Sequence, residues 1–222
     1  ILFSPLERLQ DANEINLSIF NKIISANIPL ILIDRGLTIQ PEAGGYDIIW
    51  LDNFFAGATM AQHLIKKGCE TIHFFYRPNS ANSVDLRLSG IRDAVLKNHL
   101  PFTAENIHCG DPADIDFIKT MKMMTGKTGI ICANDSTAAV LLSSLEKINV
   151  KITSDCLICG YDNMKYAQYL KYPLTSYLQP CEEMANISIE LAVRRIKNNH
   201  HIPMMINLNG KIIERKSTIF NL

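Results

Sequence analysis

The sequence predicts an α/β fold built on doubly wound, parallel β-sheet, and three observations support this prediction. Strand-like and helix-like segments alternate from one end of the chain to the other. The strand-like residues 28–33 are apolar on both faces, which is typical of a central parallel strand. Polar or charged residues follow several strands at their carboxyl ends, where open α/β sheets bind ligands.

The composition is that of a globular protein. A chain of 222 residues with 47% hydrophobic residues can bury a large core, as one domain or as two closely joined lobes. Its 22 basic residues balance its 22 acidic residues, so this chain has no basic surplus with which to bind nucleic acid strongly. Its apolar runs are short and no secretory signal pattern is present, so we expect no membrane partner.

The cysteines favour a reducing environment. They are Cys69, Cys109, Cys132, Cys156, Cys159 and Cys181. Most occupy apolar strand-like or helix-start positions rather than a disulfide framework, which indicates a cytoplasmic protein with free thiols. Cys156 and Cys159 have the spacing of a zinc or redox pair, but no second such pair or His pair accompanies them. We interpret them as two small buried residues on opposite faces of a strand.

The first elements form a predicted βαβ unit. Residues 1–3 are expected to form a strand, residues 9–24 a helix, and residues 28–33 a second strand that ends at Asp34 and Arg35. Because the chain begins directly in a strand-like segment and without methionine, we expect it to be a fragment of a longer protein.

A loop then leads to the next strand and helix. It contains Pro41, Gly44 and Gly45. A strand is expected at residues 46–51, and the side chains of Asp52 and Asn53 can cap a helix that continues to residue 67. Gly68 ends this helix.

The same alternation continues through the centre of the chain. Residues 71–76 are expected to form a strand, residues 77–85 a polar loop, and a helix is expected from near Arg87 to His99. The next predicted elements are a strand at 107–108, a turn at 110–112, a helix at 115–124, a strand at 129–133 and a helix capped by residues 134–136.

Residues 156–180 combine a strand end with an extended segment. A strand at 152–159 leads to Asp162, a carboxylate just past the carboxyl end of the strand. After a short amphipathic segment, residues 174–179 are extended up to Pro180. The remaining elements are expected at residues 182–197, a helix, and at 204–207 and 212–213, two strands.

The common catalytic signatures are absent from the sequence. It contains no GxGxxG or GxxxxGK[ST] phosphate loop, no GxSxG elbow and no HExxH helix. No nucleophile and base can be paired, so we expect no catalytic residue, no metal and no cofactor.

Six polar residues near strand ends suit the recognition of hydroxyl groups. They are Asp34, Ser83, Arg87, Asn134, Asp162 and Gln179. A carboxylate, an amide and a forked guanidinium can pair with adjacent sugar hydroxyls, which both donate and accept hydrogen bonds. Three of them also have an ordinary structural alternative: Asn134 can simply cap its helix, Arg87 can be a surface or interface charge, and Asp34 can pair locally with Arg35.

Several segments resemble the effector-binding domain of LacI/GalR-type bacterial transcription regulators. They are IPLILIDR (28–35), LDNFFAGATMAQHLIKKG (51–68), LRLSGIRDAV (86–95), ICANDSTAAVLL (131–142), ICGYDN (158–163), PLTSYLQP (173–180) and IIERKST (212–218). The resemblance covers nearly the whole chain. Its tail, IIERKST, favours a regulator over a periplasmic carrier.

The resemblance implies a periplasmic-binding-protein-like fold of type I, with two doubly wound parallel-sheet lobes joined by three crossovers. We place the crossovers near Leu51, Gln179 and Asn209. The N-terminal lobe would hold residues 1–50 and 181–208, and the C-terminal lobe residues 51–180 and 209–222. Relatives normally begin with two more strands and helices, so the N-terminal lobe is expected to be truncated.

The resemblance also implies roles for individual residues. In sugar-responsive relatives the residues that match Arg87, Asn134 and Asp162 bind sugar hydroxyls, and Asp34, Ser83 and Gln179 match positions that often line the same cleft. This chain departs from the pattern in two places. Pro112 stands where a cleft aromatic is frequent, and Arg77 stands where glycine is common. Arg77 can favour an acidic or phosphorylated ligand, or it can be a solvated loop residue.

These observations favour a sensor domain that binds a sugar or sugar derivative between two lobes. Lobe closure in a cytoplasmic homodimer would then alter the affinity for operator DNA, which an N-terminal domain outside this chain would bind. The alternative is a solute-binding protein of a sugar transport system, which shares the fold but carries an export signal. An enzyme on the same fold is a third interpretation.

Overall fold

The computed structural model describes residues 1–7, 11–35, 45–121, 127–198 and 202–220. The chain divides into two compact units, one of Ile1–Asp52 with Pro180–Asn209 and the other of Asn53–Gln179 with Gly210–Leu222. It passes from one unit to the other after Asp52, Gln179 and Asn209.

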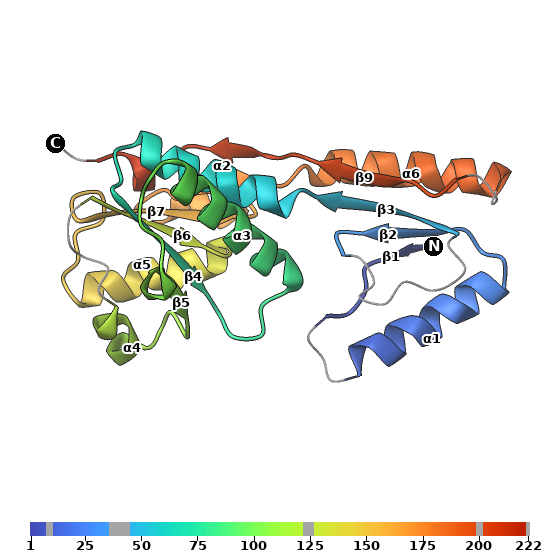
Figure 1. The fold of residues 1–222 in the computed structure, drawn as a ribbon, viewed down its shortest axis with the longest axis horizontal. Coiled ribbons are helices and arrows are strands. Elements are labelled where there is room, and N and C mark those ends of the chain that lie inside the picture. The colour runs from blue at the N-terminus through green and yellow to red at the C-terminus, as the bar shows by residue number, and fades with distance from the viewer. Residues whose placement is uncertain (8–10, 36–44, 122–126, 199–201, 221–222) are drawn as a thin grey trace. The chain divides into compact units, whose positions relative to one another are not determined.

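The first unit contains a four-stranded parallel sheet (Figure 1). Its strands, in spatial order, are β1 (Leu2–Phe3), β2 (Leu30–Ile33), β3 (Tyr46–Leu51) and β9 (Met205–Leu208). Leu32 of β2 lies opposite Ile48 of β3, and Ile48 lies opposite Met205 of β9. β3 is therefore a central strand, in agreement with its mainly apolar sequence, in which Asp47 is the charged exception.

Helices α1 (Ala12–Ser25) and α6 (Cys181–Lys197) cover opposite faces of this sheet (Figure 1). Phe20 of α1 packs in one core cluster with Leu30 and Leu32, whereas Leu191 of α6 packs in another cluster with Ile31. Because successive side chains of a strand point to opposite faces, β2 must be apolar at every position.

The second unit contains a six-stranded sheet. In spatial order its strands are β10 (Lys211–Ile213), β8 (Thr175–Leu178), β7 (Cys156–Tyr161), β6 (Thr128–Cys132), β4 (Thr71–Tyr76) and β5 (Ile107–Cys109). Neighbouring strands are parallel except that β10 is antiparallel to β8. This edge strand departs from the all-parallel sheet that the order of elements predicts, because the chain returns after the third passage in the reverse direction.

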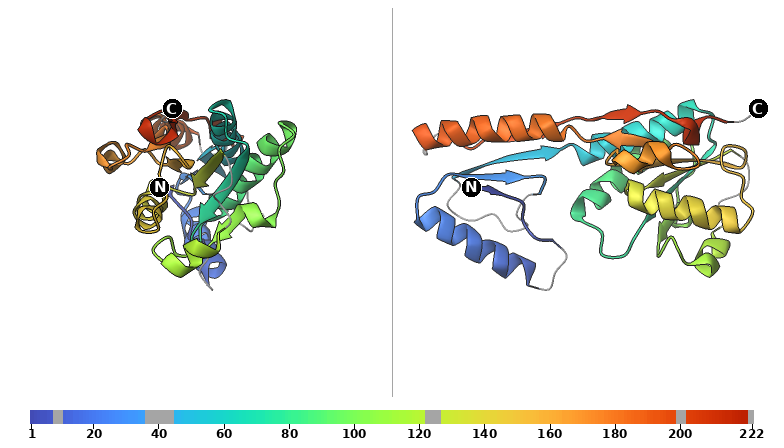
Figure 2. Two further views of the ribbon diagram at one scale, coloured as in Figure 1. Left: turned by 90° about the vertical axis from the view of Figure 1, so that its left-hand side faces the viewer. Right: turned by 180° about the vertical axis from the view of Figure 1, so that it is seen from behind.

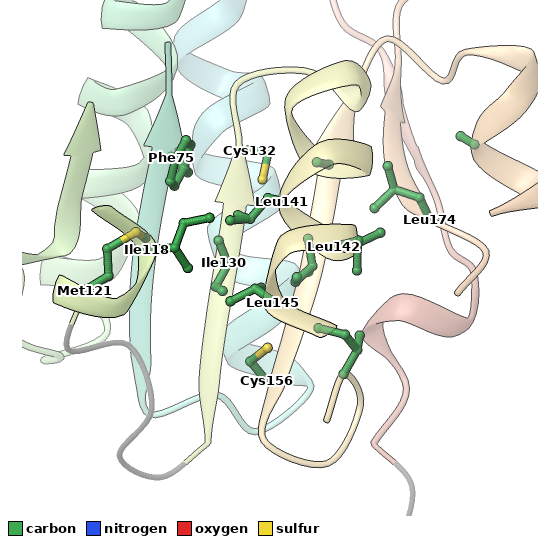
Figure 3. Close-up of a cluster of buried hydrophobic side chains, with 14 residues drawn as sticks. Phe75, Ile118, Met121, Ile130, Cys132, Leu141, Leu142, Leu145, Cys156 and Leu174 are labelled. Carbon is green, nitrogen blue, oxygen red and sulfur yellow. The ribbon is translucent and has the colours of Figure 1, made fainter. Parts of the chain in front are cut away.

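Two pairs of helices cover this sheet, with α2 (Asn53–Lys66) and α3 (Asn82–Lys97) on one face (Figure 2). The other face carries α4 (Ile115–Thr120) and α5 (Asp135–Lys147). Figure 3 shows the core beneath α5, where Leu141, Leu142 and Leu145 lie over strand residues that include Ile130 and Cys156. This buried apolar layer fixes α5 on the sheet.

Two glycines allow α2 and α3 to touch backbone to backbone. A Cβ atom added at Gly57 would collide with the carbonyl oxygen of Arg87, and one added at Gly90 would collide with the carbonyl oxygen of Phe54. Neither neighbour is a flexible side chain that can move away. The close approach therefore requires glycine at both positions, and it determines where α3 places Arg87.

Some predicted boundaries are wrong. α3 begins at Asn82 rather than near Arg87, because Val84 lies three residues before Arg87 on the same buried side of the helix. Ser83 is therefore a helix residue, not a loop residue. β7 begins at Cys156, and Ile152 makes only an isolated bridge.

Several predicted features fall partly outside the described residues. These are residues 9–10 at the predicted start of the first helix, the loop residues 41 and 44, and residues 122–124 at the predicted end of another helix. That last helix, α4, ends at Thr120 rather than at 124, because the backbone is already extended at Met121.

Polar groups are buried as pairs in both units. In the first unit the Nε and Nη2 atoms of Arg195 donate to the two carboxylate oxygens of Asp47 over 2.7 and 2.8 Å, and both side chains are fully buried. In the second unit Nδ1 of His73 lies 2.9 Å from Nε2 of His108. Burial lowers the pKa of each histidine to about 4, so the pair is neutral near pH 7.

The cysteines are free thiols. Cys156 and Cys159 are buried, and burial raises the pKa of Cys156 to about 12 and that of Cys159 well above its usual value. Among the described residues no group of three or more His, Cys, Asp or Glu side chains could hold a metal ion. None of the described helices combines the length and the hydrophobicity needed to span a bilayer.

Candidate ligand-binding site

The candidate site lies at the carboxyl ends of β6, β7 and β8 in the second unit, beside the first turns of α2 and α3. Arg87 is its best-held side chain, with only 8% of its surface exposed. Its Nε donates to Oδ1 of Asn53 over 2.9 Å, and its Nη1 donates to the carbonyl oxygen of Ala133 over 2.6 Å. Arg87 is therefore not an exposed surface charge, which was one of the alternatives that the sequence leaves open for it.

An aromatic stack supports the guanidinium. Its central carbon lies 3.4 Å from the centre of the Tyr161 ring, which places a cation against an aromatic face. The rings of Tyr161 and Tyr177 are stacked, with 5.4 Å between centres and 7° between planes. The Tyr161 hydroxyl also donates to Oδ1 of Asn53, over 3.2 Å.

Sequence reasoning missed three residues of this arrangement: Asn53, Tyr161 and Tyr177. Asn53 is expected from the sequence to cap α2, whereas in the structure its Oδ1 accepts hydrogen bonds from Arg87 and Tyr161. The only sequence signal for Tyr161 is its position beside Asp162 at the end of β7.

Arg87 keeps one donor group for a ligand. The fold uses Nε and Nη1, and no described residue accepts a hydrogen bond from Nη2, which is not buried. A guanidinium fixed by two hydrogen bonds and a ring face can present this third nitrogen in a defined direction.

Asn134 serves as a helix cap without using all of its side chain. Its Oδ1 accepts from the backbone N–H of Thr137 over 2.8 Å and from Oγ of Ser136 over 2.9 Å. The Nδ2 group has no partner among the described residues and is not buried. Capping and ligand binding are thus compatible, because they use different atoms of the amide.

Asp162 and Gln179 contact each other directly. Nε2 of Gln179 donates to Oδ1 of Asp162 over 2.6 Å, and the backbone N–H of Asp162 donates to the carbonyl oxygen of Tyr177 over 3.0 Å. Asp162 has φ 101° and Asn163 has φ 51°. Two consecutive non-glycine residues in this region are strained, and such strain is concentrated at ligand-binding sites.

The remaining two candidates lie in different units. Ser83 is one helical turn before Arg87 on α3, on the same side, and its hydroxyl has no partner in the described structure. Asp34 follows β2 in the first unit, where its carboxylate lies 3.8 Å from Nε of Arg35 and is 43% exposed. The structure therefore brings five of the six candidates to one edge of the second unit, and shows for Asp34 the local ion pair.

Comparison with known proteins identifies the family to which the chain belongs. Residues 61–218, more than half of the chain, match the model of the periplasmic binding protein-like domain. The chain belongs to this family.

A curated relative of this periplasmic binding protein-like domain is the HTH-type transcriptional repressor PurR of Vibrio atlanticus. It is 30% identical over 200 residues, which are 86% of this chain and 58% of the relative. The chain thus spans somewhat more than half the length of this relative.

Solved structures of LacI-family regulators share the fold. The regulator from Enterococcus faecium with bound ribose has a TM-score of 0.76 and 24% identity, over 98% of this chain and 79% of that one. The complex of the regulator CelR with cellobiose has a TM-score of 0.80 and 22% identity, over 97% of this chain and 64% of that one. Together with the family match, these relatives confirm the resemblance to the effector-binding domain of LacI/GalR-type regulators.

Two further charged residues of the domain lie near the site. Nη1 of Arg77 is 3.8 Å from Oδ1 of Asp111, and both side chains are well exposed, which agrees with a solvated loop residue. Asp135, in contrast, is fully buried at the start of α5, and burial raises the pKa of its carboxyl group to about 6. Nothing in the sequence distinguishes Asp135 from an ordinary first-turn acidic residue.

Proposed function

We propose that this periplasmic binding protein-like domain is the ligand sensor of a DNA-binding transcription regulator and binds a sugar or sugar derivative. The observation that carries the proposal is the set of polar groups at one edge of the second unit. Arg87 and Asn134 each keep a donor for a ligand, and Asp162 adds a carboxylate that Gln179 orients.

This set matches a polyhydroxyl ligand in its chemistry. Each sugar hydroxyl can donate to the carboxylate of Asp162 while it accepts from Nη2 of Arg87 or Nδ2 of Asn134. A ligand without hydroxyls would leave these groups unpaired after desolvation, so the site would reject it. The ribose and cellobiose complexes of the two LacI-family neighbours support this class of ligand.

The regulatory step would be a change in the arrangement of the two units. A ligand can shift this arrangement only if it binds one arrangement more tightly than the other. We propose that it favours closure of the units as lobes around the ligand, with Asp34 as a further contact. In a cytoplasmic homodimer this closure would alter operator affinity through a separate DNA-binding domain.

The PurR repressor relative supports a regulator rather than a transport protein or an enzyme. The balance of 22 basic and 22 acidic residues supports the assignment of operator binding to another part of the protein. The proposed action is binding without turnover.

Isothermal titration calorimetry with a panel that includes ribose and cellobiose tests the proposal. Asp162→Ala is expected to abolish the binding of any sugar that the native chain binds. Asp116→Ala is the matched control, because Asp116 is 93% exposed on α4, a helix that follows β5 rather than β6, β7 or β8. Undiminished binding by Asp162→Ala would contradict the site, and a panel without any binder would contradict the ligand class.

A further inference from the structure

The turn formed by residues 162–164 follows β7 and carries the carboxylate of Asp162, which we propose binds the ligand. Its left-handed residues, Asp162 and Asn163, are unfavourable in isolation, so the surrounding structure must hold them. Each backbone N–H of the turn does have an acceptor. That of Asp162 donates to Tyr177, that of Asn163 donates to Oγ of Ser176 over 2.9 Å, and that of Met164 donates to Asp135.

Asp135 is the charged group among these acceptors. Its Oδ2 accepts from the N–H of Met164 over 2.7 Å, and its Oδ1 accepts from Oγ of Ser176, also over 2.7 Å. Ser176 accepts in turn from Asn163, so two of the three backbone bonds of the turn depend on the one carboxylate.

Gly160 makes room for this carboxylate. A Cβ atom added at Gly160 would collide with Oδ1 of Asp135, the atom that holds Ser176. β7 therefore lacks a side chain at the point where the carboxylate of α5 reaches the next strand, β8. The burial of a carboxylate is costly, and here it is offset by hydrogen bonds that all lead to the ligand-binding turn.

We infer that Asp135 is a positioning residue, whose ionised carboxylate holds the turn of residues 162–164 in the strained conformation that presents Asp162 to the ligand. This inference rests on the proposed function, in which Asp162 binds the sugar. It predicts that ligand affinity depends on the charge of a residue that does not itself touch the ligand.

The groups around Asp135 come from four elements. The negative charge of Asp162, at the end of β7, opposes ionisation, and the positive charge of Arg215, in the C-terminal segment, favours it. The buried thiols of Cys132 and Cys159 and the hydroxyl of Tyr166 also face it, and all three remain neutral near pH 7 because burial raises the pKa of each. The charge that changes in the physiological range is therefore that of Asp135.

Protonation of Asp135 would remove part of this support. Because burial raises its pKa to about 6, Asp135 gains a proton in mildly acidic solution, whereas an ordinary aspartate does not. A protonated carboxyl group has lost its negative charge and one of its oxygens has become a donor, so its hydrogen bonds with Met164 and Ser176 lose the strength of charge-assisted bonds. The turn should then loosen as the pH falls below about 6.

The first test needs no ligand. Hydrogen exchange of the Asn163 and Met164 amides, corrected for intrinsic rates, is measured by NMR between pH 5 and 8 on the whole chain. Protection should fall with a midpoint near pH 6 in the native chain and should be low and independent of pH in Asp135→Asn. The exposed control Asp116→Asn should behave as the native chain does, and protection without a midpoint in the native chain would overturn the inference.

The second test uses a sugar of the panel as probe. Its dissociation constant should rise about tenfold from pH 8 to pH 5 in the native chain. In Asp135→Asn it should be raised by about the same factor at pH 8 and should change little with pH. Equal affinity and an equal pH profile in both chains would overturn the positioning role, whereas a native chain that binds no sugar would contradict the proposed function alone, because amide exchange still decides the inference.

Ser176→Ala separates the two branches of the network. It removes the acceptor of the Asn163 amide but leaves the contact between Asp135 and Met164. Protection of Asn163 should be lost, while the pH midpoint at Met164 should remain. This variant keeps the inference testable if Asp135→Asn does not fold, and loss of the Met164 midpoint in Ser176→Ala would count against a direct role of Asp135.

Discussion

The guanidinium carbon of Arg87 lies 3.4 Å from the centre of the Tyr161 ring. Arg87 belongs to α3 and Tyr161 ends β7, so this contact connects a helix on one face of the sheet with the strand that leads to Asp162. Both residues are further joined through Oδ1 of Asn53. The side chain of Arg87 is therefore held in place by β7, the strand that leads to Asp162.

Arg87→Lys should weaken sugar binding about tenfold or more, because a single ammonium nitrogen replaces the rigid fork in which Nε and Nη1 bond to Asn53 and Ala133 and Nη2 is left for a ligand. The free energy of unfolding should fall by about 1–3 kcal/mol. Arg92→Lys, an exposed residue on the same helix, should change neither quantity. Calorimetric titration and urea unfolding measure both, and unchanged affinity in Arg87→Lys would remove Arg87 from the site.

Gly90→Ala should lower both stability and sugar affinity, because the added methyl group forces α3 away from the Phe54 carbonyl and moves Arg87. Overpacking of this kind costs about 1–3 kcal/mol. Gly68→Ala is the control: Gly68 has φ +91° and open space around it, so alanine there should cost about 1–2 kcal/mol through backbone strain and leave binding unchanged. Native affinity in Gly90→Ala would show that the helix contact does not position Arg87.

Arg195→Met should destabilise the first unit by about 3–5 kcal/mol, because it leaves the fully buried carboxylate of Asp47 without its cation. Trp50, the single tryptophan, lies in β3 with Asp47, so its fluorescence during urea unfolding reports on this unit. Arg35→Met breaks a partly exposed ion pair with Asp34 in the same unit and should cost about 0–1 kcal/mol. Equal effects of the two substitutions would contradict this distinction.

The buried pair of His73 and His108 should make the fold sensitive to acid. Each pKa is lowered from 6.5 to about 4, so its contribution to stability is complete above pH 6.5 and is lost as the pH falls towards 4. The loss should reach about 3 kcal/mol for each histidine. Replacement of both by glutamine should flatten the dependence of the unfolding free energy on pH over this range.

The pH dependence of the unfolding free energy must be compared between the native chain and the double glutamine variant, because Asp135 changes stability with pH in the opposite direction. Its raised pKa means that its contribution is present below about pH 4 and is lost as the pH rises towards 6. The exposed His99→Asn variant should keep the native pH dependence. A double glutamine variant with the native slope would show that the histidine pair does not titrate as its burial indicates.

Elements with clear local boundaries could be predicted from the sequence to the residue. β3 and β4 have the expected ends, because each is a six-residue run of mainly branched and aromatic residues between polar residues or glycine. The start of α3 could not be predicted in this way. Its first turn is polar and has no side-chain cap, and it becomes helical because Val84 is buried with the rest of the helix.

The candidate site could be predicted only in outline. Position after a strand was enough to nominate Asn134 and Asp162. Their supports lie far away along the chain: Asn53 is 34 residues from Arg87 and 108 from Tyr161. Such pairings follow from packing and have no local signature, which is also why Asp135 was not recognised. The ligand contacts of the nominated residues remain predictions.

The chain passes between the two units three times, and each time it enters or leaves the second unit beside the candidate site. Asn53 follows the first passage and bonds to Arg87, Gln179 precedes the second and bonds to Asp162, and the N–H of Gly210, after the third, donates to the hydroxyl of Tyr177 over 2.9 Å. Under the proposed function, three separate hydrogen bonds therefore connect the candidate site with the segments that lead to the first unit. Loss of any one hydrogen bond leaves two others through which an occupied site can act on the rest of the protein.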